Sequence, residues 1–347
     1  MSGPDGRPLV SVFLPCRDAA AFLPDCIASL RAQTLERFEV LAVDDGSADA
    51  TPALLSDWAA DDPRVRTFRT GGRGPAAACN RAAREARAPV LARMDADDVA
   101  RPDRLEAQLR LLAGRPGLAA CGTGVEFFPE EEVGPGWRRY QRWINGLREP
   151  EEIRRDLLVE CPLASPALAV RRSVFRALEG YRDMGWPEDY DFVLRLHRAG
   201  MRAASVERRL LRWRRHGDNL SRNHPAYTPE AFLRCKVHFL LHGLLPADRR
   251  PVIWGAGEVG KPLARALAGE GRPPAGFVEL DPRKIGQQIH GAPVWPPDGF
   301  RRRFPHPGSE EDAYVLGAVG APGARGEIRE ALRATGREEL ADFRMVA

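Results

Sequence analysis

Short apolar runs alternate with longer amphipathic segments from residue 8 to residue 128, and this alternation limits the fold more than any other feature of the sequence. The apolar runs have the length and composition of buried strands, and the segments between them carry apolar residues at helical spacing. Strands that alternate with helices of about ten to fifteen residues are typical of βαβ units and a mainly parallel sheet. The sequence therefore predicts an α/β fold. We expect strands at residues 9–14, 38–43, 65–68 and 90–94, with Pro15 ending the first, and helices at residues 20–33, 50–60 and 76–86.

A second alternation of the same kind begins close to residue 247 and predicts a smaller α/β domain. The apolar residues just before it are expected to form a linker helix, for which packing between the domains is a plainer role than lying on a membrane surface. The expected elements of the second domain are strands at 251–254, 275–280 and 313–319 and helices at 261–270 and 326–335. The predicted divisions are residues 1–228, a linker helix at residues 229–246, and residues 247–347.

Charge and cysteine usage argue against several classes of protein. The chain has 52 Lys and Arg against 48 Asp and Glu, and it lacks the block of like charges that marks a nucleic-acid-binding tail. No run approaches the ~18–20 apolar residues of a membrane-spanning helix, and the N-terminus lacks the layout of a signal peptide. The six cysteines are scattered, without zinc spacing or the density of a disulfide scaffold. We expect a cytoplasmic protein with reduced thiols; peripheral contact with the inner face of the membrane is also compatible with the sequence.

Acidic residues follow two of the expected strands. Asp44 and Asp45 follow one strand, and Asp95 and Asp97 follow another, at the strand ends where ligands bind in parallel sheets. Clustered carboxylates repel one another unless a cation compensates, and Mg²⁺ or Mn²⁺ prefers carboxylate oxygens and bridges to phosphates. The alternative is that these are turn and helix-capping aspartates. Arg73 lies in a glycine-rich loop and is suited to binding a diphosphate, although a solvated loop arginine is the plainer possibility.

Five groups of motifs follow one another along residues 8–222. They are Val10–Pro15, Val43–Thr51, Arg73-Gly74 with Asn80, Asp95–Asp98 followed by Arg101–Leu105, and Trp186–Asp191. In this order and spacing, the sequence resembles family 2 glycosyltransferases with the GT-A fold. The implied architecture is a mixed, mainly parallel sheet flanked by helices, followed here by a small Rossmann-like α/β domain.

The resemblance implies inverting, metal-assisted transfer of a sugar from a nucleotide-diphosphate sugar, by family habit a UDP-sugar, to a hydroxyl of a glycan or lipid-linked acceptor. Asp189 would be the general base, and Glu188 would orient it or the acceptor. Mn²⁺ or Mg²⁺ would be bound by Asp97, Asp95 and His216, and Arg214 would approach the diphosphate. The residues implied to contact the nucleotide sugar are Pro15, Arg17, Asp44, Asp45, Arg73 and Asp95.

Alternatives to this interpretation remain open. Glu188 and Asp189 also suit the N-terminus of a helix, whose dipole favours acidic residues. Arg17 and Asp18 stand where the family often has Tyr-Asn. A nucleotidyltransferase would usually have a glycine-rich, basic loop after the first strand, which residues 15–18 do not provide. A nucleotide-sugar-sensing protein with a decayed transferase site is the alternative outside catalysis.

The second domain contains a glycine turn between an expected strand and an expected helix. Gly255, Gly257 and Gly260 have the spacing of a dinucleotide-binding turn, and Asp281 follows about twenty residues later. In such turns the glycines allow phosphates to approach the helix N-terminus, and the acid binds a ribose. We therefore expect a nucleotide or NAD-like ligand, with a degenerate domain that binds nothing as the alternative.

Overall fold

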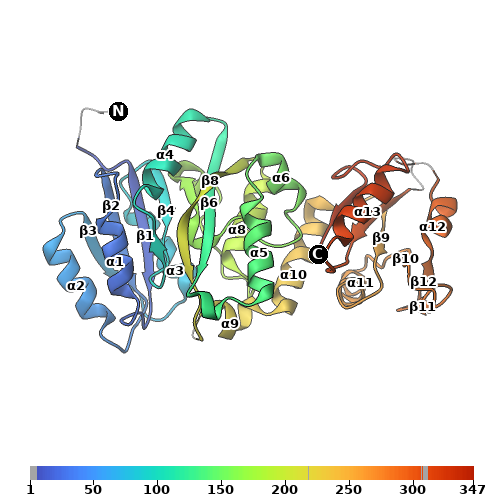
Figure 1. Ribbon diagram of the computed structural model, residues 1–347, viewed down its shortest axis with the longest axis horizontal. Coiled ribbons are helices and arrows are strands. Elements are labelled where there is room, and N and C mark those ends of the chain that lie inside the picture. The colour runs from blue at the N-terminus through green and yellow to red at the C-terminus, as the bar shows by residue number, and fades with distance from the viewer. Residues whose placement is uncertain (1–5, 218, 306, 308–311) are drawn as a thin grey trace. The chain divides into compact units, whose positions relative to one another are not determined.

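β1 (Val10–Cys16) is a central strand of the first sheet, because it pairs in parallel with β2 (Phe38–Asp44) on one side and with β4 (Val90–Arg93) on the other (Figure 1). Neighbours on both sides and helices on both faces explain why its sequence is apolar apart from Ser11. The strand continues through Pro15, where the sequence predicted its end. Pairing with β4 stops at Phe13, so the missing N–H of Pro15 interrupts no ladder.

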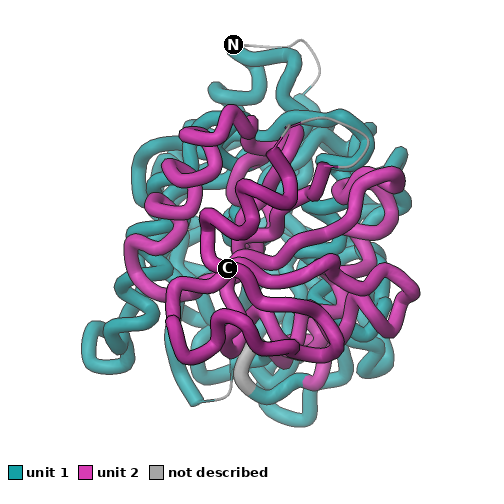
Figure 2. The backbone as a smooth tube through the Cα atoms, turned by 90° about the vertical axis from the view of Figure 1, so that its right-hand side faces the viewer, with its two compact units in different colours: residues 1–153, 162–224 teal, residues 154–161, 225–347 magenta. Residues whose placement is uncertain are grey.

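The structure is a computed structural model that describes residues 6–217, 219–305, 307 and 312–347. Its chain divides into two compact units (Figure 2). The first unit consists of residues 1–153 and 162–224, and the second consists of residues 154–161 and 225–347. A segment of eight residues from the middle of the chain therefore belongs with the C-terminal part.

The sheet of the first unit has the strand order β3-β2-β1-β4-β7-β6-β8-β5 within the described residues. The first four of these strands are parallel, and β7 is antiparallel to both β4 and β6. β6 and β8 are parallel, and β5 is antiparallel to β8. This is the mixed, mainly parallel sheet that the sequence predicts. The other strands are β3 (Val65–Arg69), β5 (Val99–Ala100), β6 (Leu118–Phe128), β7 (Ala169–Arg171) and β8 (Arg202–Arg214).

Helices cover both faces of this sheet. α1 and α2 each connect neighbouring strands in one direction across the sheet, whereas α3 leads back from β3 to β4. Because such crossovers are right-handed, α1 and α2 lie on one face and α3 lies on the other. The buried residues of α3 are alanines and a cysteine, so this helix can lie close to the strands. The helices are α1 (Leu23–Arg31), α2 (Thr51–Asp61), α3 (Pro75–Glu85), α4 (Arg104–Gly114), α5 (Pro135–Asn145), α6 (Pro150–Arg155), α7 (Arg172–Ala177), α8 (Glu188–Arg198) and α9 (Leu220–Asn223).

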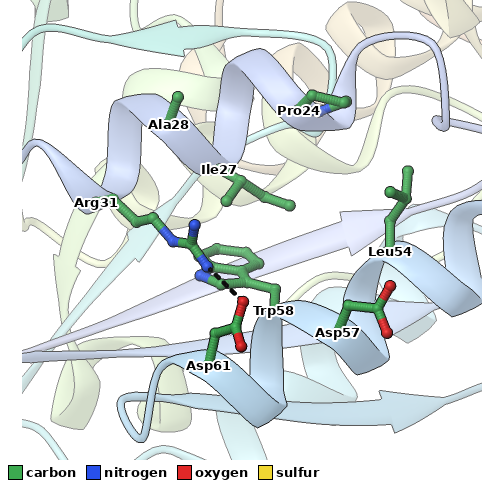
Figure 3. Close-up of a pocket in the computed structure, with 8 residues that line it drawn as sticks. All are labelled: Pro24, Ile27, Ala28, Arg31, Leu54, Asp57, Trp58 and Asp61. Carbon is green, nitrogen blue, oxygen red and sulfur yellow. Dashed lines mark ion pairs between the residues drawn. The ribbon is translucent and has the colours of Figure 1, made fainter.

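A shallow hollow of about 340 Å³ lies between α1 and α2 (Figure 3). Ile27 and Trp58 form its apolar floor, and an ion pair of 3.7 Å between Arg31 and Asp61 closes one side. None of the residues that the sequence assigns to the site lines it. The hollow is a gap between two surface helices.

α5 covers the side of β6 that is left free where its pairing with β7 ends at Cys121. Gln141 accepts a hydrogen bond of 2.6 Å from the backbone N–H of Phe127. Asn145 accepts from the N–H of Val125 at 2.7 Å and donates to its carbonyl oxygen at 2.8 Å. These two side chains satisfy backbone groups that would otherwise need a neighbouring strand.

The second unit contains a smaller sheet with the order β11-β12-β10-β9-β13-β14 within the described residues. All its pairings are parallel except that of β11 with β12. The strands are β9 (Arg250–Trp254), β10 (Gly276–Val278), β11 (Gln288–Ile289), β12 (Ala292–Trp295), β13 (Ala313–Gly317) and β14 (Phe343–Met345), and the helices are α10 (Pro229–Phe239), α11 (Gly260–Gly269), α12 (Pro297–Arg303) and α13 (Ala324–Arg333).

Buried charges attach residues 154–161 to the second unit. Lys236 of α10 donates to the carbonyl oxygens of Val159 and Val346 at 2.8 and 3.1 Å. Arg329 of α13 pairs with Asp156 at 2.5 Å. Among the described residues, no helix combines the length and apolar character needed to cross a bilayer.

Candidate active site

Acidic side chains gather where the parallel strands of the first unit end. Asp44 ends β2 and Asp45 follows it, and Asp95 and Asp97 follow β4. The first residue of α8 adds Glu188, whose carboxylate reaches the end of β4 through Arg93. Segments far apart in the sequence therefore meet at one edge of the sheet.

Asp97 meets His216, which follows β8. Nε2 of His216 lies 2.9 Å from Oδ2 of Asp97. Asn219 donates to the same oxygen at 3.1 Å and accepts from the backbone N–H of His216 at 2.9 Å. The ring of Phe22 packs against the imidazole, with centroids 4.3 Å apart. Nδ1 of His216 is buried and has no hydrogen-bond partner in the described part of the chain.

Asp98 and Arg214 support the loop that carries Asp97. Oδ1 of the fully buried Asp98 accepts from the backbone N–H of Arg214 at 2.7 Å. The guanidinium of Arg214 donates to the carbonyl oxygen of Asp97 at 2.7 Å and pairs with Asp25 at 2.6 Å. Burial raises the pKa of Asp98, and the negative charge of Asp97 adds to the rise. Arg214 therefore stabilises this loop directly, a role that the sequence did not predict.

Arg93, the last residue of β4, connects the two acidic segments. Its Nε donates to Oδ1 of Asp95 at 2.8 Å, and its Nη1 donates to Oε1 of Glu188 at 2.9 Å. Only 4% of Arg93 is exposed, and its guanidinium lies over the ring of Tyr181 at 5.5 Å. Sequence reasoning missed this residue. The available signal was a charged residue at the end of an apolar strand, since buried charges occur with partners.

Asp189 lies in the first turn of α8 and is half-buried. Its Oδ1 accepts from the backbone N–H of Tyr190 at 2.7 Å. Burial raises the pKa of Asp189 to about 7, the negative charge of Glu188 adds to this rise, and the positive charge of Arg93 opposes it. A carboxyl group with a pKa near neutrality is suited to accept a proton and release it again.

Hydrogen bonds fix the segment that leads into α8. Asn80 of α3 donates to the carbonyl oxygen of Tyr181 at 2.8 Å and accepts from its N–H at 2.9 Å. The buried Asp191 accepts from both Arg182 and Arg195, each at 2.6 Å. These contacts determine where the first turn of α8 presents its acids.

Asp45 organises the loop after β3. Its Oδ1 accepts from the hydroxyl of Thr70 at 2.7 Å and from the backbone N–H of Arg73 at 2.9 Å, and its Oδ2 accepts from the N–H of Gly74 at 2.7 Å. Both carboxylate oxygens of Asp45 therefore bind this loop. The side chain of Arg73 is left extending into solvent.

Asp44 is buried beside Asp45 and has partners of its own. It accepts from the backbone N–H of Ser47 at 3.0 Å, and its other oxygen lies 3.0 Å from Nε of Arg69. The side chain of Arg17 is 58% exposed at the end of β1. The residues that the sequence assigned to the nucleotide sugar all follow or end the parallel strands at one edge of the sheet: Pro15, Arg17, Asp44, Asp45, Arg73 and Asp95.

The glycine turn of the second unit follows β9 and leads into α11. Gly255 has a φ of +110°, and a Cβ atom at Gly260 would lie 1.8 Å from the carbonyl oxygen of Gly255. These two positions therefore require glycine for the turn to close. A Cβ atom at Gly257 would meet nothing within 4 Å, so this glycine borders open space.

The acid beside this turn is Glu279, whereas the sequence placed Asp281 there. β10 ends at Val278, so Glu279 is the first residue beyond the strand, and it accepts from the N–H of Ala256 at 3.0 Å. Lys284 pairs with the same oxygen of Glu279 at 3.1 Å. Asp281 instead pairs with a neighbouring arginine at 2.9 Å.

Three comparisons with known proteins bear on the first unit. Residues 11–179 match the profile of the family described as "Glycosyl transferase family 2". An uncharacterized glycosyltransferase of Haemophilus influenzae is 29% identical over 220 residues, which cover 62% of this chain and 68% of that protein. A chondroitin synthase of Pasteurella multocida is 27% identical over 56% of this chain, and the match spans 19% of that protein.

Residues 11–179 are a family 2 glycosyltransferase domain. The crystal structure of S. aureus TarS 1–349 in complex with UDP-GlcNAc has a similar fold, with a TM-score of 0.55 at 16% identity over 74% of this chain and 71% of that one. The chain has the α/β fold expected from the sequence: a large mixed sheet flanked by helices in the first unit, followed by a second, smaller sheet.

The family match ends before α8 and before the segment that carries His216. The family match therefore says nothing about three of the site residues. The structure alone places Glu188, Asp189 and His216 beside the matched domain. Asn219 also escaped sequence reasoning, because only the turn after β8 brings it to Asp97.

Proposed function

We propose that this chain transfers a sugar, with inversion at the anomeric carbon, from a UDP-sugar to a hydroxyl group of a glycan or lipid-linked acceptor. One observation supports this proposal most directly: Asp97 contacts His216 at the edge of the sheet where the strands end. At the same edge, Arg93 binds Glu188 in the first turn of α8. A binding site for a charged leaving group and a proton acceptor are the two parts that such a transfer needs.

A divalent cation, Mn²⁺ or Mg²⁺, fits the residues at this edge. Within the described ranges, no three His, Cys, Asp or Glu side chains lie close enough together to surround a metal ion alone. Such ions are, however, commonly bound by one or two carboxylates together with substrate phosphates. Asp97 and His216 would supply protein ligands, with Asp95 beside them, and the donor's diphosphate would supply the rest. The bound ion would offset the charge of the departing diphosphate.

Asp189 is the proposed general base. Its carboxylate takes the proton from the acceptor hydroxyl while that oxygen bonds to the anomeric carbon. The bond from this carbon to the diphosphate oxygen breaks, and the diphosphate leaves with the bonding electrons. A single displacement of this kind inverts the anomeric configuration. Positioned proton transfer typically contributes roughly 10²–10⁴-fold to such a rate.

The loop held by Asp45 is the proposed nucleotide side of the site. Arg73 and Arg17 extend there, and they would contact the nucleotide and its phosphates. The UDP-GlcNAc in the TarS complex supports a UDP-sugar donor. A relative named chondroitin synthase supports a carbohydrate acceptor.

In the second unit we propose a nucleotide or NAD-like ligand at Gly255, Gly257 and Gly260. The open space at Gly257 supports this proposal. The Glu279 carboxylate, which lies against the turn, would take the role of binding a ribose hydroxyl that the sequence gave to Asp281.

The test is release of UDP and formation of glycoside when the protein, Mn²⁺, a UDP-sugar and an oligosaccharide acceptor are combined. We expect Asp189→Asn to retain donor binding and lose most transfer, and Asp97→Ala to lose metal-dependent donor binding. Donor binding by the wild type without any UDP release would instead support the nucleotide-sugar-sensing alternative.

A further inference from the structure

Arg93 is a buried cation shared by two carboxylates. One nitrogen contacts Asp95 and another contacts Glu188, 95 positions away in the sequence. The side chains of Arg93 and Glu188 are 5% and 6% exposed, so solvent screens this contact weakly. Truncating one partner would leave a buried charge uncompensated, which is strongly destabilising.

The geometry of this contact requires arginine. A guanidinium is planar and directs several N–H groups in fixed directions, so one side chain can hold two carboxylates at a set separation. A lysine at this position would keep the charge and could satisfy only one carboxylate well. Arg93 therefore sets the spacing between the loop after β4 and the first turn of α8.

Glu188 and Asp189 are neighbours in α8, and successive helical residues point about 100° apart. Arg93 contacts Glu188, and no hydrogen bond or ion pair joins it to Asp189 among the described contacts. Glu188 is thereby fixed as an ion-pair partner, whereas Asp189 accepts from the backbone N–H of Tyr190 and is held in no ion pair among the described residues.

We infer that Arg93 is a positioning residue of the transfer reaction: by holding Glu188, it leaves Asp189 as the carboxylate that receives the acceptor proton. This inference rests on the proposed function. It assigns different roles to two adjacent acids that the sequence could only treat as a pair.

The groups that face Asp189 make the inference testable by pH. The charged and titratable ones are Glu188 on its own helix, Arg93 from β4 and the buried thiol of Cys79 from α3, and the Ser165 hydroxyl also lowers the pKa of Asp189. The charge of Glu188 raises the pKa of Asp189 and the charge of Arg93 lowers it. Removing Arg93 should therefore move the acidic limb of the kcat–pH profile to higher pH, and Glu188→Gln should move it to lower pH.

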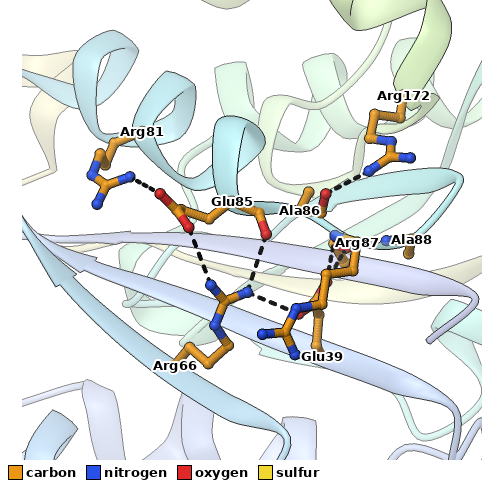
Figure 4. Close-up of polar contacts among 9 residues, drawn as sticks. Glu39, Arg66, Arg81, Glu85, Ala86, Arg87, Ala88 and Arg172 are labelled. Atoms are coloured by element: carbon orange, nitrogen blue, oxygen red, sulfur yellow. Dashed lines mark hydrogen bonds and ion pairs between the residues drawn. The ribbon is translucent and has the colours of Figure 1, made fainter. Parts of the chain in front are cut away.

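Arg66 of β3 provides a matched control, and Figure 4 shows its contacts with two acids. It also bridges two acids, contacting Glu39 at 3.4 Å and Glu85 at 3.1 Å. Glu39 in turn accepts from Ser11 at 2.7 Å and from the N–H of Arg87 at 2.8 Å. Arg66→Gln should therefore lower stability without touching the proposed reaction.

The experiment compares Arg93→Gln, Arg93→Lys, Glu188→Gln and Arg66→Gln in the full chain, measuring UDP affinity with Mn²⁺, kcat for transfer and the kcat–pH profile. We expect Arg93→Gln to lose about 10²-fold in kcat, as misplacement of a reacting group by about 1 Å can cost. UDP affinity should change much less. Arg93→Lys should recover part of kcat, and Arg66→Gln should keep both kcat and its pH profile.

The inference is overturned if folded Arg93→Gln keeps the wild-type kcat and pH profile, or if it loses only stability, as Arg66→Gln does. Should Arg93→Gln not fold, Arg93→Lys takes its place, and a wild-type kcat there overturns the inference equally. Failure of the proposed function has a different signature, namely full transfer by Asp189→Asn in the same assay.

Discussion

Asp189, the proposed base in α8, lowers the free energy of unfolding near neutral pH. Burial and Glu188 raise the pKa of Asp189 to about 7, whereas an unfolded aspartate titrates near 4. The folded state therefore binds a proton more tightly than the unfolded state. It follows that this group lowers the free energy of unfolding as pH rises from about 4 to about 7.

Asp189→Asn should for this reason raise the melting temperature at pH 8 while it removes transfer. Each kcal/mol gained corresponds to roughly 2–4 °C for a folding unit of about 150–250 residues. Thermal unfolding of the two proteins at pH 8 and at pH 4.5 measures the effect, which should shrink at the lower pH. A variant that is less stable than the wild type at pH 8 would contradict the ionised, half-buried state of Asp189.

The same pKa predicts how transfer depends on pH. A general base acts in its deprotonated form, so kcat should rise through about pH 7 and level off above it. Initial rates at saturating donor and acceptor between pH 5.5 and 9 measure this limb. A limb centred near pH 4, the value for an exposed aspartate, would argue against Asp189 as the base.

At the level of elements, α3 positions α8 through one side chain. Asn80 exchanges two hydrogen bonds with the backbone of Tyr181, just before the loop that leads to Glu188. Asn80→Ala leaves both backbone groups without this partner and should cost about 1–3 kcal/mol. We expect a lower kcat with little change in UDP affinity, since the nucleotide side of the site is held by Asp45 instead.

Asn145→Ala is the matched control for this prediction. Asn145 also exchanges two hydrogen bonds with one backbone residue, Val125 of β6, and has no contact with the α8 segment among the described hydrogen bonds. Both variants should lose stability, measured by urea unfolding, but only Asn80→Ala should lose kcat. Equal kcat values for the two variants would mean that α3 does not position the acids.

The sequence predicts elements better than it predicts contacts between them. The period of apolar residues locates β1, β2, β4 and their connecting helices within a few residues, because burial on both faces dictates that pattern. Arg93 and Asn219 could not be found in this way, since their partners lie at distant positions that only the folded sheet brings near. Asp45 could be placed at the site, but its contacts with the loop after β3 required the structure.

For the whole molecule, the sequence predicts two α/β units, but it does not predict that residues 154–161 belong to the second one. Residues 154–161 lack any pattern that would assign them to the second unit, because a buried lysine of α10 holds them there. The predicted linker helix is α10, which belongs to that unit and ends at Phe239. Gly243, with a φ of +136°, prevents the regular helix from reaching residue 245.

Two glycines of the second unit distinguish folding from ligand binding. Gly260→Ala places a methyl group 1.8 Å from a backbone oxygen and should unfold or strongly destabilise this unit. Gly257→Ala meets no atom within 4 Å, so it should keep the fold and weaken only a ligand that approaches the turn. Thermal unfolding with and without NAD or UDP measures both effects, and equal destabilisation by the two substitutions would contradict the close packing at Gly260.

The central claim is that a nucleotide sugar binds at the carboxyl edge of the first sheet with a divalent ion held by Asp97 and His216. The most direct measurement is the shift in melting temperature produced by UDP-, GDP- and dTDP-sugars, with and without Mn²⁺, in the wild type, Asp97→Ala and Gly257→Ala. We predict a shift with a UDP-sugar that requires Mn²⁺, disappears in Asp97→Ala and persists in Gly257→Ala. A shift that survives Asp97→Ala and is lost in Gly257→Ala, or no shift with any donor in the presence of Mn²⁺, would contradict the claim.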